Sequence, residues 1–354
     1  MATDEAHIKL AERSGHADSK LLHRILEKAM TPEEARFLLE LPASNADLAA
    51  KFKMTEKAVE EKVYGLARRG LVVTSRKGIR FPRDLGTLHD NILASSPEHI
   101  PAGIGELWME FYESGWWKEI TGGLTMLPAP ALRVILPLKA VPPGVKLLPC
   151  ESAEEIIRAH KDLISIRRCC CRVGAQTVAG AQCKHPIFTC TQFGRRAEYD
   201  LYRGSGKKVS ADEAISIHHE ATGAGLTPTV TNISVMEGLE FICYCCGDAC
   251  LVLNPILRAD KVAAALSPSR FLPKVDNKLC NGCRDCVPAC CYGAIEMKAV
   301  PGYKTPVAAI IKEKCVGCGI CVLKCQPKAI VMELVKPPEF IPASITGPSS
   351  IVHG

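Results

Sequence analysis

The sequence predicts an α+β protein. Its first part is a small helical domain with a hairpin, its middle is a cysteine-rich α/β domain, and its C-terminal domain is built on an internal repeat. Three observations support this prediction. Capped helical segments followed by an alternating stretch occupy the first 85 residues. Of the 19 cysteines, nine lie in residues 169–250 and nine in residues 280–325. In the second of these groups, the same spacing between cysteines occurs twice.

Length and composition fit a folded protein of two or three domains. The chain has 354 residues, of which 47% are apolar and 23% are charged, so it can bury real cores. The net charge of +6 suits anionic partners but is small for a dedicated nucleic-acid binder. The longest stretch without charged residues or histidine, residues 221–236, has 16 residues. It is too short and polar to span a bilayer, so we expect no membrane insertion.

The number of cysteines needs a chemical explanation. The N-terminus is charged and lacks the apolar segment of a secretory signal, so we expect a cytoplasmic protein. Structural disulfides are rare in that reducing compartment. Metal binding is therefore the leading explanation for the cysteines.

Residues 1–85 predict a winged-helix-like docking domain. Capping sequences at Thr31, Ser44 and Thr55 open three helical segments, the last of which ends at Gly70. LVVTSRKGIRF then alternates around a tip at residues 76–78, as the two strands of a hairpin do. The third helix mixes acidic and basic residues and offers little positive field to phosphates. Protein docking or a structural role is therefore favoured over DNA binding.

Residues 86–150 predict an aromatic helix and a proline-rich connector. The segment ELWMEFYESGWWKE concentrates five aromatic residues, whose expected role is core packing. Six prolines follow between Leu127 and Pro149. Such frequent prolines predict an extended connection over a surface.

Residues 151–268 predict a metal or iron–sulfur domain. A capped helix from Ser152 leads to the cysteines at 169–171, and a second capped helix starts at Ser210. His218 and His219 lie on that second helix; because they are adjacent they should point in different directions and not act as a ligand pair. The cysteines of this segment cluster beside arginines, which argues against their being only small apolar residues of a core. The candidate ligands are Cys169, Cys171, Cys183, Cys190, Cys243, Cys245, Cys246 and Cys250.

The identity of this metal stays open between two alternatives. A third [4Fe-4S] cluster would take four thiolates, such as Cys171, Cys183, Cys190 and one cysteine of the later group. Zinc would take four cysteines, or three together with His185. The nearby arginines slightly favour the cluster, because a cubane with four thiolates carries about two or three negative charges.

Residues 269–336 contain the repeat. The spacing C-x2-C-x2-C-x3-C at residues 280–290 recurs at residues 315–325, and the same offset of 35 maps Ala294 onto Ala329. Three thiolates two residues apart on a glycine-containing loop can each bind one iron of a single cluster. Zinc sites usually come as pairs of C-x2-C, so this spacing favours iron–sulfur. The segment between the two runs predicts two short strands around Pro301 and Gly302.

This repeat resembles the bacterial two-[4Fe-4S] ferredoxins. The resemblance implies a βαβ-βαβ fold in which the fourth cysteine of each run binds the other cluster. One cluster would be held by Cys280, Cys283, Cys286 and Cys325, and the other by Cys315, Cys318, Cys321 and Cys290. The family's proline directly after the fourth cysteine is replaced here by Cys291 and Gln326. We expect Cys291 to be a spare thiol.

The order of the cysteine groups extends the resemblance. A C-x-C-R segment and a C-x-C-C group before a two-cluster repeat are similar to a poorly characterised class of iron–sulfur proteins from anaerobic bacteria. Many members of that class carry a helix-turn-helix-like N-terminus. Residues 337–354 are expected to form an extended tail.

These features predict an iron–sulfur electron-transfer protein or subunit that passes low-potential electrons between redox protein partners. Clusters held by four cysteines have no open iron position, so a component of an oxidoreductase system is favoured over a stand-alone catalyst. Two alternatives remain open. One is a redox enzyme with a catalytic iron–sulfur or zinc site in the middle domain. The other is a winged-helix DNA-binding redox sensor.

Overall fold

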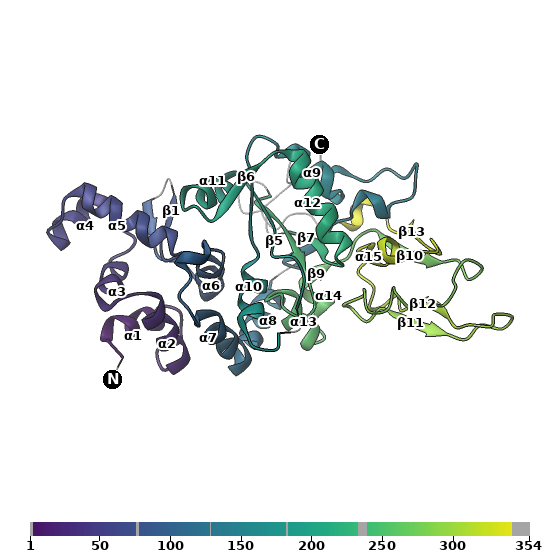
Figure 1. Cartoon of the computed structure of the whole chain (residues 1–354), viewed down its shortest axis with the longest axis horizontal. Helices are drawn as coiled ribbons and strands as arrows, with labels where there is room; N and C mark the ends of the chain where they lie inside the picture. The colour runs from purple at the N-terminus through teal and green to yellow at the C-terminus, as the bar shows by residue number, and fades with distance from the viewer. Residues whose placement is uncertain (1–2, 76–77, 128, 182, 233–238, 342–354) are drawn as a thin grey trace. The chain divides into compact units, whose positions relative to one another are not determined.

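The computed structural model describes residues 3–75, 78–127, 129–181, 183–232 and 239–341. Helices and strands are mixed, as expected for an α+β protein (Figure 1). The chain forms two compact units, each assembled from separate stretches. The first unit comprises residues 1–116, 167–188 and 197–207, and the second comprises residues 117–166, 189–196 and 208–354.

The first unit is mainly helical. Its elements are α1 (Glu5–Glu12), α2 (Lys20–Ala29), α3 (Pro32–Leu39), α4 (Asn45–Phe52), α5 (Glu56–Arg68), β1 (Val73–Ser75), β2 (Gly78–Arg80), α6 (Leu85–Leu93), η1 (Pro97–His99), α7 (Ile104–Phe111), η2 (Tyr112–Trp116), α10 (Cys170–Thr177) and most of α11 (Gly194–Tyr202). The expected capping boxes at Thr31 and Ser44 are present, and Thr55 caps α5. Strands β1 and β2 pair antiparallel, and residues 76 and 77 of the predicted hairpin tip lie outside the described residues.

Aromatic side chains fill the core of the first unit. Trp108 has no exposed surface, and Phe111 and Trp116 are buried against it with ring centroids 6.1 and 5.4 Å away. The expected packing role is therefore confirmed for Trp108, Phe111, Tyr112 and Trp116, whereas Trp117 is only partly buried. Helix α10 packs against α6 and α7, and it comes so close that a Cβ on Gly105 would lie 2.2 Å from Thr177 Oγ1.

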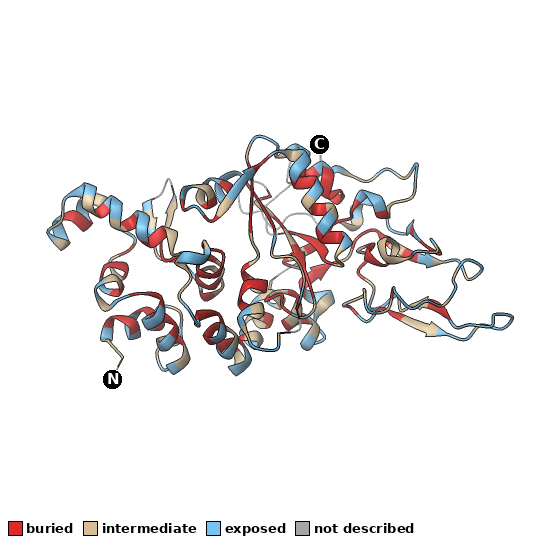
Figure 2. Cartoon of the chain, in the orientation of Figure 1, coloured by how far each residue is buried: buried red, intermediate tan, exposed pale blue. Residues whose placement is uncertain are grey.

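The second unit is built on a sheet with the strand order β6-β4-β5-β8-β7-β3-β9. The strands of this sheet are β3 (Leu132–Val134), β4 (Ile164–Arg168), β5 (Phe188–Phe193), β6 (Gly206–Val209), β7 (Thr227–Thr231), β8 (Phe241–Cys245) and β9 (Leu266–Ser267), of which β4, β5 and β6 have end residues that count to the first unit. The central strands are largely buried (Figure 2). Around the sheet lie α8 (Trp117–Thr125), η3 (Leu138–Ala140), η4 (Pro149–Glu151), α9 (Ala153–Ala159), α12 (Ala211–Gly223), α13 (Leu253–Arg258) and α14 (Val262–Ala265).

Two expectations for this region are wrong. Residues 132–134 of the proline-rich connector form β3, which pairs with both β7 and β9 inside the sheet and does not simply cross a surface. A three-residue strand between prolines is too short to show alternation in the sequence. The helix that starts after Ser152 ends at Ala159, and β4 carries the chain onward to Cys169.

The cysteine repeat folds as two similar halves within the second unit. Strands β10 (Phe271–Val275) and β13 (Ile330–Leu334) pair antiparallel, and so do β11 (Ile295–Lys298) and β12 (Val307–Ile310). The second pair confirms the strands predicted around Pro301 and Gly302. Helix α15 (Ile320–Lys324) precedes Cys325, whereas turns at residues 285–289 take its place in the first half. A short helix η5 (Pro338–Phe340) follows, and residues 342–354 of the expected tail lie outside the described residues.

Candidate metal centres

The two cysteine loops of the repeat have the same local structure. Gly282 and Gly317, which correspond at the repeat offset, both have a positive φ, of 75° and 66°. A Cβ at Gly317 would lie 2.1 Å from the carbonyl oxygen of Phe271, so only glycine fits there. Each loop is also followed by an N–H···S hydrogen bond: Ala294 N–H donates to Cys290 Sγ at 3.4 Å, and Ala329 N–H donates to Cys325 Sγ at 3.2 Å.

The eight thiols of these loops form two groups, each with a member from the other half of the repeat. Cys286 has Cys325, Cys283 and Cys280 as neighbours, and these four are called the first thiol group. Cys321 has Cys318, Cys315 and Cys290 as neighbours, and these four are called the second thiol group. The structure therefore brings together the residues that the resemblance assigns to each cluster.

Burial makes the charged thiolate form of these cysteines unfavourable unless a cation is bound to it. Burial, together with the neighbouring thiols, raises the pKa of Cys286 to about 11. Burial likewise raises the pKa of Cys318 to about 12, with Cys290 and Cys315 adding to the effect. Thiols of this kind release their protons when a positively charged metal centre takes the thiolates. The two groups fit iron–sulfur clusters in number, donor type and spacing.

Comparison with known proteins agrees with this geometry. The model of the 4Fe-4S dicluster domain matches residues 279–329, a range that contains all eight thiols. The chain contains a ferredoxin-like iron–sulfur domain. This domain binds 4Fe-4S clusters and gives the chain a general role in iron–sulfur electron transfer. No curated protein and no solved structure matches the chain. Among the described residues, no helix has both the length and the apolar character needed to cross a bilayer.

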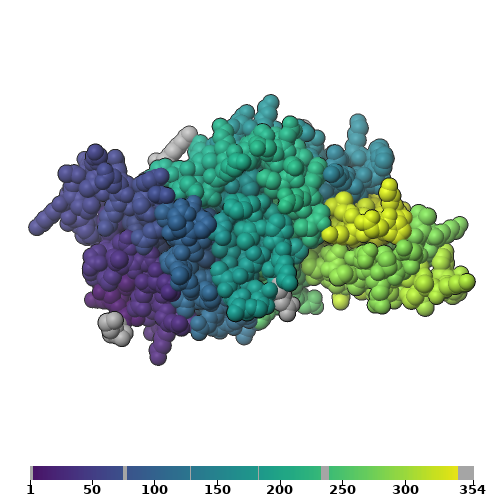
Figure 3. All heavy atoms as spheres, viewed as in Figure 1, coloured from purple at the N-terminus to yellow at the C-terminus, as the bar shows by residue number. Residues whose placement is uncertain are grey.

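The exposure of the two thiol groups in the ferredoxin-like domain differs. Cys283 of the first group is exposed, and Cys280 is partly exposed. In the second group Cys321 is buried, and the other three cysteines are partly buried. The surface of this domain, yellow-green to yellow in Figure 3, is open to solvent over much of the face shown. The first thiol group therefore includes the thiols that are more accessible to solvent.

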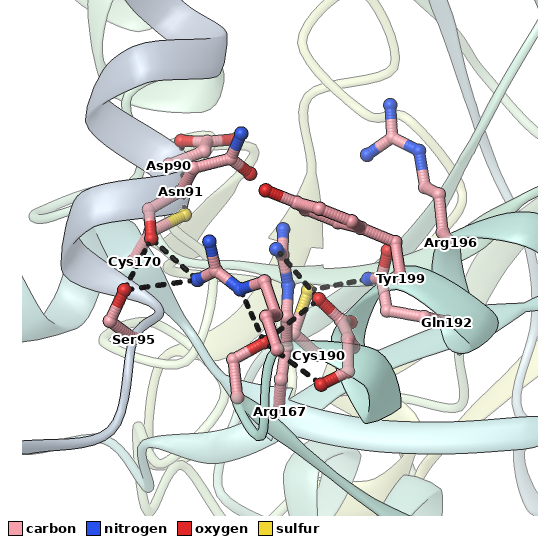
Figure 4. Close-up of polar contacts among 12 residues, drawn as sticks. Asp90, Asn91, Ser95, Arg167, Cys170, Cys190, Gln192, Arg196 and Tyr199 are labelled. Carbon is pink, nitrogen blue, oxygen red and sulfur yellow. Dashed lines mark hydrogen bonds and ion pairs between the residues drawn. The ribbon is translucent and has the colours of Figure 1, made fainter. Parts of the chain in front are cut away.

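The remaining candidate ligands divide between the two units. Cys169, Cys171 and Cys183 belong to the first unit, whereas Cys190, Cys243, Cys245, Cys246 and Cys250 belong to the second. The first unit also places Cys170, which the sequence does not single out, beside Asp90. Its thiol donates to Asp90 Oδ1 at 3.0 Å (Figure 4). His89 Nδ1 lies 3.1 Å from the same oxygen.

Four thiols of the second unit lie together on one face of the sheet. Strand β5 pairs with β8 through Thr191 and Ile242, and continuing that register by one residue puts Cys190 opposite Cys243. Cys245 lies two residues further along β8 and projects from the same face. Side-chain hydrogen bonds join Cys243 to Cys190 and Cys245 to Cys250. We call Cys190, Cys243, Cys245 and Cys250 the sheet thiols.

Hydrogen bonds to sulfur hold the sheet thiols in place. The Gln192 amide Nε2 donates to Cys190 Sγ at 3.0 Å (Figure 4). The Thr229 hydroxyl lies 3.3 Å from Cys245 Sγ, and the Leu253 N–H donates to Cys250 Sγ at 3.4 Å. The hydrogen bond to Cys190 and burial raise the pKa of Cys243 well above its usual value. Four thiols from three segments, three of them buried and Cys243 half-buried, suit either an iron–sulfur cluster or zinc.

The sheet thiols lie next to the second thiol group. Thr227 is the pairing partner of Cys245 on the neighbouring strand β7. The Thr227 side chain also hydrogen-bonds to the thiols of Cys318 and Cys291. Tyr292 is buried with Cys291, Cys318 and Cys245 around it. One threonine therefore connects the sheet face to the ferredoxin-like domain, and the sequence contains no motif that announces it.

Proposed function

We propose that this protein transfers low-potential electrons through two [4Fe-4S] clusters in the ferredoxin-like domain and a third centre held by the sheet thiols. The proposal is carried by one observation: the sheet thiols lie beside the second thiol group. A cluster, when bound, supplies a site that gains and loses one electron. The chain supplies the thiolates, the N–H···S hydrogen bonds and the burial that set the reduction potential.

The three sites suggest a direction for the electron path. The first thiol group includes the exposed Cys283 and is the natural contact point for a redox protein partner. The second group is less accessible and is followed by the sheet thiols, which Thr227 links to Cys318. Electrons would thus move between a surface partner and the interior of the second unit. A [4Fe-4S] cluster is the favoured occupant of the sheet thiols, because zinc does not change oxidation state.

Metal analysis of protein prepared without oxygen tests the proposal. Three clusters predict about 12 iron and about 12 acid-labile sulfide per chain, and two clusters predict about 8 of each. About 8 iron together with one zinc whose X-ray absorption shows sulfur at about 2.3 Å would assign zinc to the sheet thiols. A colourless protein without iron would contradict the whole proposal.

Replacing the crossing ligands tests the arrangement of the two clusters. We expect Cys290→Ala to disturb the second cluster, and Cys325→Ala the first, although each residue belongs to the other run of the sequence. Electron paramagnetic resonance of the dithionite-reduced protein reports this change. Cys291→Ala is the matched control, because its thiol neighbours Cys290 in sequence but belongs to neither group.

A further inference from the structure

A carboxylate of the second unit faces two adjacent histidines. Glu154 is the second residue of α9, and His218 and His219 lie on α12, which packs against α9. Glu154 Oε1 is 3.1 Å from His219 Nε2 and 3.7 Å from His218 Nε2. The expectation that these histidines point apart does not hold for their rings. Their backbone directions differ, but both rings reach the same oxygen.

His218 is the unusual member of this group of one carboxylate and two histidines. Its side chain has no exposed surface, and neither ring nitrogen has a hydrogen-bond partner among the residues that the structure describes. A buried polar group without a partner loses its hydration without compensation. A neutral imidazole in this position offers the lone pair of a ring nitrogen to a cation.

Glu154 is held in a fixed orientation. The backbone N–H of Leu138 donates to both carboxylate oxygens, at 3.1 and 3.2 Å, and the Ser152 hydroxyl donates to Oε2 at 3.3 Å. These two donors fix the carboxylate in an orientation in which Oε1 faces the histidines. Carboxylates that bind metals are commonly held in orientation by hydrogen bonds of this kind.

We propose that Glu154, His218 and His219 bind a divalent transition-metal ion of the zinc type. Their three donor atoms lie within 4.8 Å of one another. Donors of tetrahedral zinc, each about 2.0–2.1 Å from the metal, are about 3.3 Å apart, close to the two measured separations. Two imidazoles and one carboxylate are a common zinc ligand set that leaves a fourth position for water. The His219 side chain is 29% exposed, so that position can be reached from solvent.

The charges around the cluster permit this assignment. The Lys139 ammonium lies near His218, but the Glu154 carboxylate lies there too and offsets its charge. The Tyr244 ring is 5.7 Å from the His218 ring. Tyr244 lies between Cys243 and Cys245 on β8, so its side chain projects from the opposite face of the sheet. The nitrogen and oxygen donors are therefore separate from the sheet thiols, and the two kinds of site can be distinguished.

Zinc K-edge X-ray absorption of the full chain, with its clusters loaded and zinc added, tests the proposal. We expect a shell of nitrogen and oxygen at about 2.0–2.1 Å without sulfur at about 2.3 Å. Glu154→Gln and His219→Ala should each weaken zinc affinity at least tenfold. Glu155→Gln is the matched control, because Glu155 is exposed on the same helix and should leave the affinity unchanged.

Two results would overturn the proposal. One is a zinc shell that consists of sulfur, and the other is zinc affinity that neither Glu154→Gln nor His219→Ala changes. Since His219 is partly exposed, His219→Ala gives a folded variant even if the buried Glu154→Gln does not. The result is independent of the number of iron–sulfur clusters, which iron and sulfide analysis reports separately.

Discussion

Cys243 lies opposite Cys190 on neighbouring antiparallel strands, although 53 positions separate them in the sequence. Together with Cys245 and Cys250 they form a largely buried site of four sulfurs. Thr227, on the adjacent strand, connects this site to Cys318 of the ferredoxin-like domain. Strand pairing therefore puts a third candidate centre beside the second thiol group.

Replacing either of the paired cysteines should empty the third centre. Because a cubane needs four thiolates, we expect Cys190→Ala and Cys243→Ala each to lower iron from about 12 to about 8 per chain. Iron and acid-labile sulfide analysis measures the change. Cys150→Ala is the control, since Cys150 is buried but belongs to none of the thiol groups. Iron that stays at about 12 in both variants would remove the sheet thiols as cluster ligands.

Gly317 should be essential for the second cluster. A Cβ there would lie 2.1 Å from Phe271 O, and the residue has a φ of 66°. We expect Gly317→Ala to lose about 4 iron per chain, because the loop must move. Gly302→Ala is the control: Gly302 also has a positive φ, of 87°, but a Cβ there meets nothing. That variant should keep its iron and lose about 1 kcal/mol of stability. Equal iron content in the two variants would contradict the steric argument.

A buried ion pair should stabilise the start of the ferredoxin-like domain. Arg270 Nε and Nη2 donate to Glu151 Oε1 and Oε2 at 2.8 and 2.7 Å, and both side chains are buried. Glu151→Gln leaves the guanidinium without its counter-charge, so we expect a loss of about 3–5 kcal/mol in the free energy of unfolding.

Denaturant unfolding at matched cluster content measures this loss. Asp212→Asn is the control, because it breaks the exposed pair of Asp212 with Arg158 and should cost under about 1 kcal/mol. If the two variants lose the same free energy of unfolding, the buried Arg270–Glu151 pair contributes no more to stability than the exposed pair.

Stability should depend on pH through His218. Burial lowers the pKa of His218 from 6.5 to about 4 in the folded chain. Between these values the unfolded chain binds more protons, so the free energy of unfolding falls as the pH drops below about 6.5. From pH 7 to pH 5 we expect a loss of about 2 kcal/mol that His218→Gln does not show. Urea unfolding with EDTA present measures it. Glu154, His219 and Lys139 are unchanged in both proteins, and equal pH slopes would contradict the assignment to His218.

Features that depend on neighbouring residues can be predicted from this sequence. The capping boxes at Thr31 and Ser44 form as expected, because each capping residue bonds a residue only three positions further along the chain. Strand β3 could not be predicted, since its three residues carry no periodicity and pair with strands about 100 and 130 positions away. The contact of His218 and His219 with Glu154 likewise depends on how α9 and α12 pack.

By itself, the sequence determines the ferredoxin-like domain, because the spacing of its eight cysteines is the spacing that iron–sulfur chemistry imposes locally. Only the tertiary structure decides which of the other thiols come together, because that choice depends on strand register. A shift of one residue in the pairing of β5 with β8 would turn Cys190 to the other face of the sheet.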